Sequence, residues 1–293
     1  MKGKSMSGNM KAIPFLLPFF IIYMMFTIYP IFKGLQMSFY DWSIIQKMEF
    51  VGFANYIKMF QDPDFWGSLW NTTLFTILST PTMIILALVL ALMANSKSKL
   101  RGFYRGAYFL PSILSVSVIS YIAIFFLQPY TGFLNSFLHM VGIQKEFFWL
   151  AEPTLAWVSI VGVTLWWTVG FNMILFLAAL QDIPDYLYES ADIDGGTAWQ
   201  KFRYITLPQL IPIGRVVLLL QILASYKVFA QILLITGGGP GTKTRPLIQY
   251  IYQAGFEKFN LGYAATMSYA LFFILLILSL IQLKSRSDDQ GVI

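Results

Sequence analysis

Six long apolar segments restrict the fold of this 293-residue chain more than any other feature. A helix needs roughly 20 mainly apolar residues to cross about 30 Å of hydrocarbon. Six segments meet this length, and they cover residues 13–33, 72–95, 107–127, 155–180, 212–235 and 263–283. None of them alternates polar and apolar residues as the strands of a membrane barrel do. The sequence therefore predicts an all-α integral membrane protein, with one transmembrane domain over residues 1–293.

The composition supports this prediction and excludes several kinds of site. Charged residues make up 12% of the chain, against about 25% in soluble domains. The chain has no cysteine and one histidine, His139, so neither a disulfide nor a metal site is expected. Lys2, Lys4 and Lys11 precede the first apolar segment, but that segment is longer than the roughly 7–15 residues of a signal peptide. We expect a retained helix there.

The distribution of positive charge predicts the orientation. With the N terminus inside, the inner segments hold eleven Lys and Arg residues and the outer segments hold seven. The short inner segment 97–105 has four of them and no acid, and short loops weigh most in this rule. Both termini are therefore predicted to be cytoplasmic. Outer segments 34–71 and 128–154 are each long enough for short interfacial helices.

The inner segment 181–211 contains signals for two short helices. Residues 186–193 are good helix formers and Gly195–Gly196 should end that helix. Thr197 and Gln200 have the spacing of a capping box, which predicts the start of a second helix. Pro208 should then break this helix before the fifth span. The result would be a helix–turn–helix unit on the cytoplasmic face.

A motif in this segment resembles one in the permease subunits of binding-protein-dependent ABC importers. Their motif reads E-A-A, three residues, G, nine residues, I-x-L-P, and every spacing is met at Glu189, Ser190, Ala191, Gly195, Ile205, Leu207 and Pro208. Ser190 in place of the middle alanine is the one departure. The resemblance implies that these residues couple the permease to an ATPase subunit. The alternative is an ordinary pair of interfacial helices.

Further segments resemble the maltose-type and glycerol-phosphate-type branch of the same family. They are Tyr29-Pro30, Ser38-Phe39, Asp41-Trp42, 50–56, Asn71-Thr72, Arg105-Gly106, Leu110-Pro111, 234–240 and 262–265. The resemblance implies the type I importer permease fold, a multi-pass location in the bacterial cytoplasmic membrane, and a sugar or oligosaccharide substrate. It also implies a second permease in a heterodimer, two ATPase subunits that bind ATP and Mg, and an extracellular or periplasmic binding protein. The chain itself would bind no cofactor and catalyse no reaction.

The glycine-rich loop before the sixth segment is predicted to lie outside the membrane. Its residues are Gly237, Gly238, Gly239 and Pro240. It is not a P-loop, because Thr242 stands where a glycine must precede Lys243. We interpret it as a turn that faces a docked binding protein. A simple chain reversal is the alternative.

Polar groups inside the predicted spans are candidates for the substrate pathway, because such groups are costly in hydrocarbon. The candidates are Tyr121, Trp166, Trp167, Asn172, Gln221, Ser225, Tyr226 and Lys227. Gln221 and Ser225 are four residues apart and share a face, and Lys227 lies off it. The tryptophans would stack on a sugar and the amides would bond its hydroxyls. Lipid-facing or packing roles are the alternatives for each of them.

Other functions are weighed against the importer. Lys227 leaves open an acidic sugar or a sugar phosphate as substrate. Arg215 lies near the inner end of the fifth span, where its guanidinium should reach the interface. A secondary transporter would need intramembrane acids for ion coupling, and the spans contain none. An integral-membrane enzyme would need clustered His, Asp or Glu, and the acids cluster only in segment 181–211.

Overall fold

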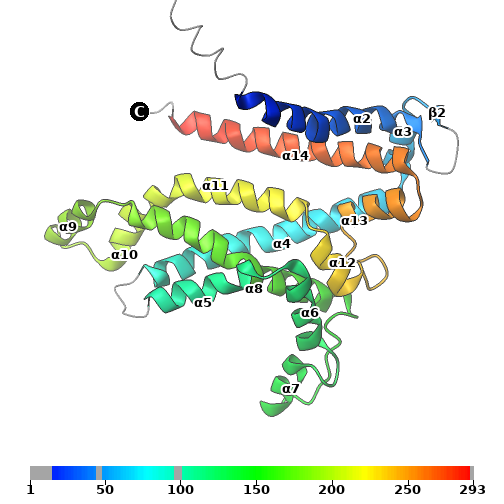
Figure 1. Ribbon diagram of the computed structural model, residues 1–293. Coiled ribbons are helices and arrows are strands. Elements are labelled where there is room, and N and C mark those ends of the chain that lie inside the picture. Colours follow the sequence, from blue (N-terminus) through cyan, green and yellow to red (C-terminus); the bar gives the residue numbers. More distant parts are fainter. Residues whose placement is uncertain (1–14, 44–47, 96–100, 291–293) are drawn as a thin grey trace, which may run out of the picture. The chain divides into compact units, whose positions relative to one another are not determined.

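The computed structural model describes residues 15–43, 48–95 and 101–290 (Figure 1). The first two residues of the first predicted span lie outside this part, as do Lys2, Lys4, Lys11, Lys47, Lys97 and Lys99. The elements in chain order are helix Phe15–Ser38 with its π-turn η1 (Met24–Ile28) and α2 (Tyr29–Ser38), β1 (Tyr40–Asp41), β2 (Glu49–Phe50), α3 (Ala54–Gln61), α4 (Pro63–Ala94), α5 (Arg101–Ile113), α6 (Val116–Leu127), α7 (Phe133–Met140), α8 (Pro153–Gln181), α9 (Asp185–Ile193), α10 (Ala198–Lys201), η2 (Phe202–Thr206), α11 (Leu207–Tyr226), α12 (Ala230–Thr236), α13 (Leu247–Tyr252), η3 (Gln253–Glu257) and α14 (Leu261–Gln290).

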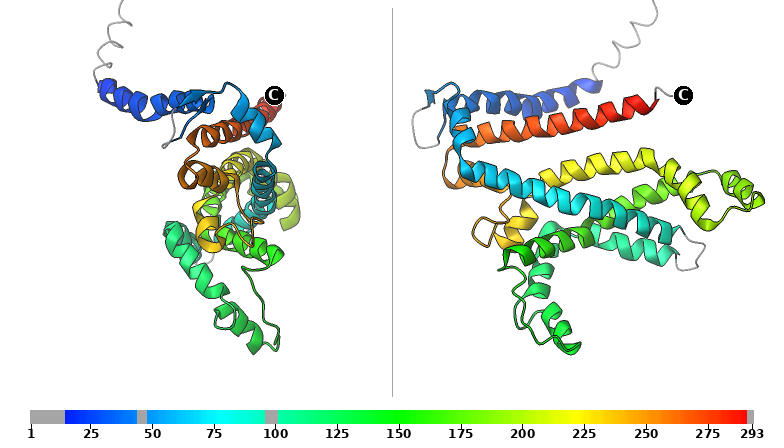
Figure 2. Two further views of the ribbon diagram at one scale, coloured as in Figure 1. Left: turned by 90° about the vertical axis from the view of Figure 1, so that its right-hand side faces the viewer. Right: turned by 180° about the vertical axis from the view of Figure 1, so that it is seen from behind.

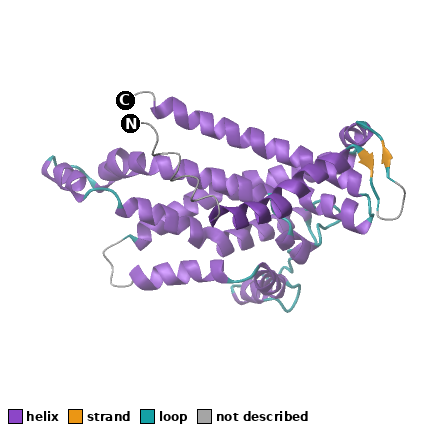
Figure 3. Ribbon diagram, turned by 45° about the horizontal axis from the view of Figure 1, so that its top comes forward, coloured by secondary structure: helices purple, strands orange, loops and turns teal. Residues whose placement is uncertain are grey.

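The described residues contain five helices that are long and apolar enough to cross a membrane, and a sixth candidate that is bent. The five are Phe15–Ser38, Pro63–Ala94, Pro153–Gln181, Ala198–Tyr226 and Leu261–Gln282. The sixth candidate joins α5 and α6 through a bend of 100°. The all-α prediction is confirmed, since the described strands are only the two-residue pair β1 and β2, which run antiparallel (Figure 3).

The third predicted span, 107–127, is not one straight helix. Pro111 lies in the last turn of α5, where it has no backbone N–H to donate. Ser115 then starts α6 by accepting a hydrogen bond from the Val118 N–H with its side chain, at 3.4 Å. The proline and the new cap together explain why the chain turns sharply between these helices.

The fifth predicted span, 212–235, has the wrong limits at both ends. Its helix starts earlier, because Pro208 does not break the chain: the π-turn η2 just before the proline absorbs the altered hydrogen-bond pattern. It also ends earlier, at Tyr226. Phe229 has φ −151° and ψ −73°, so the backbone is non-helical there before α12 begins. The predicted span placed Lys227 just past its middle. In the structure, Lys227 instead follows the last residue of α11 as its C-cap.

The chain divides into two compact units, and the first comprises residues 1–65 and 251–274. Within it, the Asn55 amide donates to the carbonyls of Ser38 and Tyr40, at 3.1 and 2.9 Å. Gly262 donates its N–H to the Trp42 carbonyl, and a Cβ at Gly262 would lie only 2.1 Å from the Tyr40 carbonyl oxygen. Several of the motif residues singled out in the sequence thus form one hydrogen-bonded corner.

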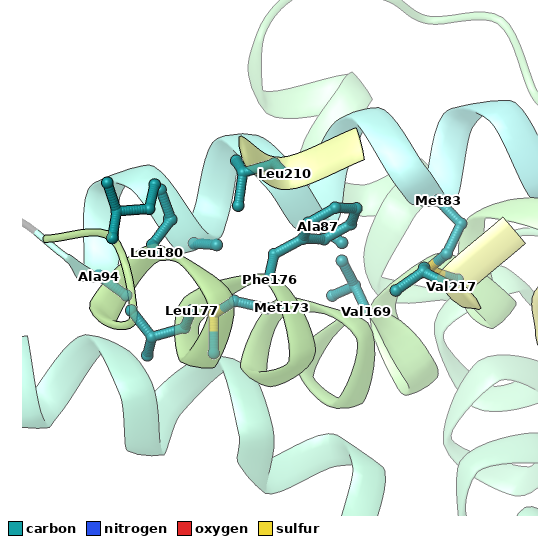
Figure 4. Packing of buried hydrophobic residues seen from close by; sticks show 12 residues of the cluster. Met83, Ala87, Ala94, Val169, Met173, Phe176, Leu177, Leu180, Leu210 and Val217 are labelled. Carbon is teal, nitrogen blue, oxygen red and sulfur yellow. The ribbon is translucent and has the colours of Figure 1, made fainter. Parts of the chain in front are cut away.

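The second unit comprises residues 66–250 and 275–293, and it contains the main apolar core. This core joins α4, α8 and α11, and Figure 4 shows Met83, Phe176 and Val217 among its side chains. Helices α5 and α8 approach each other closely at Gly170, where a Cβ would meet the Tyr108 carbonyl oxygen at 2.2 Å. The glycine is therefore required by packing.

Candidate functional site

The motif segment, residues 181–211, projects from the ends of α8 and α11, within the second unit (Figures 1 and 2). Ile183 is buried in the main core, and Leu187, Tyr188 and Ile205 pack against that core. The Tyr188 and Thr206 hydroxyls also lie within hydrogen-bond distance, at 2.9 Å. One side of the segment is therefore fixed to the membrane helices, and the other side is left exposed.

The turn between α9 and α10 has the geometry that the sequence predicts. Gly195 has φ +74°, a conformation that favours glycine, and Gly196 donates its N–H to the Ala191 carbonyl at 2.8 Å. Thr197 and Gln200 form both hydrogen bonds of the capping box, which confirms the predicted helix start. The first helix, α9, starts at Asp185 with Pro184 as its N-cap, and it includes the predicted helix formers 186–193. An ion pair of 2.6 Å between Lys201 and Asp192 joins the two helices.

The exposed side of the motif segment carries both charge and large apolar groups. Glu189 and Ser190 are exposed, Ala191 and Leu207 are half-buried, and Pro208 is exposed. Ile193 is 88% exposed, and the same segment also exposes the side chains of Tyr186, Trp199 and Tyr204. Sequence reasoning missed these four. They could have been found as apolar residues of a polar segment that lie outside every predicted span.

A cavity of about 580 Å³ lies between α4, α5, α6, α8, α11 and α12. Five of the predicted pathway residues line it, and they are Trp167, Asn172, Gln221, Ser225 and Lys227. The other three lie elsewhere. Tyr121 is 66% exposed on α6, Trp166 lies on another face of α8, and the buried Tyr226 hydroxyl contacts Thr73 at 3.2 Å.

A chain of polar contacts runs along one wall of this cavity. The Asn172 amide donates to Gln221 at 3.3 Å, and the Gln221 amide donates to the Ser225 hydroxyl at 3.3 Å. Ser225 in turn lies 3.2 Å from the Ser79 hydroxyl of α4. The shared face predicted for Gln221 and Ser225 is thus confirmed. This series of hydrogen bonds holds the Asn172 and Gln221 amides in place at the cavity wall.

Other polar lining residues were not predicted. Thr164 and Gln231 pair with each other at 2.9 Å, joining α8 to α12. The Ser112 hydroxyl also lines the cavity, and it is buried without a hydrogen-bond partner among the described residues. These residues lie far apart in the sequence, so only the i, i+4 pair on α11 was visible without the fold. Trp167 donates its indole N–H to the Leu114 carbonyl, which leaves its ring beside the cavity.

The glycine-rich loop is fixed to α4 and α13 by side-chain hydrogen bonds. Gly237 and Gly238 have φ +62° and +88°, and the Gly239–Pro240 peptide bond is cis. The Gln249 amide donates to the Gly237 carbonyl at 2.8 Å. Asn71 donates to the carbonyls of Thr242 and Arg245, at 2.9 and 3.0 Å. The loop is a fixed turn with a defined shape.

Membrane-length helices that enclose a cavity with one polar wall, together with a helix–turn–helix segment fixed to α8 and α11, define a membrane transport subunit. Residues 65–288 match the family of binding-protein-dependent transport system inner membrane components, and the chain belongs to this family. It is therefore a multi-pass membrane component of such a system. The members of this family are non-catalytic permease subunits.

Individual relatives match over nearly the whole chain. The probable ABC transporter permease YurN of Bacillus subtilis is 34% identical, over 95% of this chain and 97% of its own length. The lactose transport system permease LacF of Rhizobium radiobacter is 34% identical, over 94% and 93%. A chain in the crystal structure of a bacterial alginate ABC transporter, in complex with its alginate pentasaccharide-bound periplasmic protein, is 27% identical. Its TM-score is 0.85, and the match covers 95% of this chain and 94% of that one.

Proposed function

We propose that this chain forms half of the translocation pathway of an ATP-driven importer for a sugar or oligosaccharide. The observation that carries the proposal is the motif segment, which is fixed to the membrane core on one side and exposes Glu189 and Ile193 on the other. An exposed apolar patch beside a charged group is typical of a surface that binds another protein. The match of six of the seven motif positions, with every spacing met, supports an ATPase subunit as that partner.

A sugar fits the chemistry of the cavity. Amides held in place by a hydrogen-bonded chain can bond hydroxyl groups, and the Trp167 ring offers an apolar face. The relatives named for lactose and for arabinooligosaccharides support this substrate class. An acidic sugar is not favoured over a neutral one, because relatives are named for both: one for lactose, others for sulfoquinovosyl glycerol and for the acidic polysaccharide alginate. A secondary transporter is not favoured either, because the family belongs to binding-protein-dependent systems.

The proposed complex contains a second permease, two ATPase subunits that bind ATP and Mg, and an external binding protein. The crystallised alginate transporter with its periplasmic protein supports a binding protein as one of these partners. With the motif segment against the ATPases, both termini lie in the cytoplasm, as the positive charges predict. The glycine-rich loop then lies on the opposite face, where a binding protein docks.

Site-directed cross-linking tests the assignment, because the chain contains no cysteine. Ile193→Cys should cross-link to an ATPase subunit in the assembled transporter, and the link should change when ATP is added. Met140→Cys is the matched control, since it is 84% exposed on α7 and should not form this link. No link from Ile193→Cys, together with ATP-independent uptake by the reconstituted chain, would overturn the proposal.

A further inference from the structure

A second hollow lies in the transmembrane part of the chain, on a different face of α8 from the polar cavity. Its volume is about 560 Å³. One wall comes from α8 with Val158, Ser159, Gly162, Val163 and Trp166, and the rest from Ile122, Ala123, Phe126, Leu127, Phe133, Leu134 and Trp149. The α8 residues repeat at the spacing of one helical face, and so do those of α6. The hollow is therefore a groove between two helices.

The groove gives a sugar nothing to bind. Its serine, Ser159, already donates to the Trp149 carbonyl at 3.2 Å. The Trp149 indole N–H donates to Asn135 at 2.9 Å, and Asn135 is fully buried. The remaining lining groups are carbon, and an apolar hollow of this kind does not hold ordered water. Its occupant must therefore be apolar.

The surroundings of the groove indicate that this occupant is lipid. Val158 and Trp166 lie on its rim and are 58% and 47% exposed, on a helix long enough to cross the membrane. Eight residues separate them, which is about 12 Å along the helix. Inside the groove, the Phe126 ring centroid on α6 lies 5.0 Å from that of Phe133 on α7, so the apolar lining continues from one helix to the other. A groove that opens sideways from a membrane helix and has an exposed apolar rim faces hydrocarbon.

One end of the groove has a polar boundary with a positive charge. The Trp149 ring lines the groove and stacks on Phe147, with centroids 5.2 Å apart. The ammonium of the exposed Lys145 lies 5.2 Å from the Phe147 centroid. The neighbouring Glu146 carboxylate is occupied, because it accepts from the Tyr130 N–H and the Asn135 amide. Lys145 is thus placed to meet a phosphate.

We propose that this groove, between α6, α7 and α8, binds one phospholipid molecule. An acyl chain fills the space between Trp149 and Trp166, and the phosphate lies at Lys145. The lipid would hold α7 against α8 by filling the space between them. This inference does not depend on the identity of the transported substrate.

Gly162 allows a direct test. A Cβ built at Gly162 meets no atom within 4 Å, so the side chain of Gly162→Leu has room to leave the helix and extends into the groove. Gly67→Leu on α4 is the matched control, because that glycine also has open space and lies outside the groove. The complete transport complex is placed in nanodiscs of phosphatidylethanolamine and phosphatidylglycerol. The phosphatidylglycerol carries a photoactivatable group at the end of an acyl chain.

Cross-linked peptides from α6 and α8 are expected in the unchanged complex. Gly162→Leu should lower this labelling about tenfold, the factor that about 1.4 kcal/mol of lost binding produces, and Gly67→Leu should leave it unchanged. Val158→Trp, on the exposed rim, fills the groove from outside and should act in the same way if Gly162→Leu fails to assemble. Equal labelling in all variants would overturn the proposal. So would labelling of the isolated chain that disappears in the complex, since a partner subunit would then cover the groove.

Discussion

Ile193 offers a quantitative test of the motif segment, because its side chain is 88% exposed in the chain by itself. Truncation to alanine removes three carbon groups, and each buried group contributes about 0.8 kcal/mol, so full burial against a partner would be worth about 2.4 kcal/mol. A docked surface rarely desolvates every atom. We therefore expect Ile193→Ala to weaken ATPase binding by about 1–2 kcal/mol, which is roughly 5- to 30-fold in Kd.

The assay measures binding of purified ATPase subunits to the permease in nanodiscs, together with the thermal stability of the permease alone. Because the Ile193 side chain is almost fully exposed in its own chain, the Tm of the Ile193→Ala permease should equal that of the unchanged permease. Met140→Ala on α7, at 84% exposure, controls for the loss of any exposed apolar side chain. An unchanged Kd for Ile193→Ala, or an equal loss for the control, would refute the assignment of this face to the ATPase.

Three further substitutions test the core and the cavity. Phe176→Ala, at 2% exposure, should cost about 3–5 kcal/mol and lower the Tm of the purified chain, whereas Phe171→Ala, exposed on the same helix, should not. Gly170→Ala should separate α5 from α8 and lower the yield of folded protein in size-exclusion chromatography, and Gly162→Ala should be tolerated. Gln221→Leu removes one of the two acceptors of the buried Asn172 amide and should destabilise the fold by about 1–3 kcal/mol. If the cavity is the pathway, Gln221→Leu should also reduce the maximal rate of uptake in proteoliposomes more than Ile174→Ala does, since Ile174 is an exposed residue of α8 outside the cavity lining.

Local signals in the sequence predicted local structure well. The Thr197–Gln200 capping box was visible because its two residues are neighbours and their geometry depends only on the chain around them. The prediction that Pro208 ends a helix was wrong. A proline usually interrupts a helix, but here a π-turn lies directly before it and the helix continues from Ala198 to Tyr226. Hydropathy also concealed the end of α11, since Val228 and Phe229 continue the apolar run across the break.

Long-range contacts could not be predicted from one sequence. Asn71 and the glycine-rich loop were each recognised, but nothing in the chain indicates that this amide donates to the Thr242 carbonyl, 171 residues away. The different positions of Trp166 and Trp167 could not be predicted either, because the two residues are chemically alike and adjacent in the chain. A helix rotates by about 100° per residue, so Trp167 lines the cavity of 580 Å³ and Trp166 lines the apolar groove. Which face meets which space is decided by the packing of α8 against its neighbours.

One helix connects the motif segment with the cavity. The 29 residues from Ala198 to Tyr226 form a continuous helical stretch, about 44 Å long at 1.5 Å per residue. Its first turns belong to the motif segment, and its last turns carry Gln221 and Ser225 in the cavity wall. Because Phe176 and Val217 hold this helix in the core, a displacement at α10 would pass along it as one body. The helix breaks after Tyr226, and α12 beyond the break is held separately by the hydrogen bond between Gln231 and Thr164 of α8. A partner that moves the motif segment would therefore change the polar wall of the cavity directly.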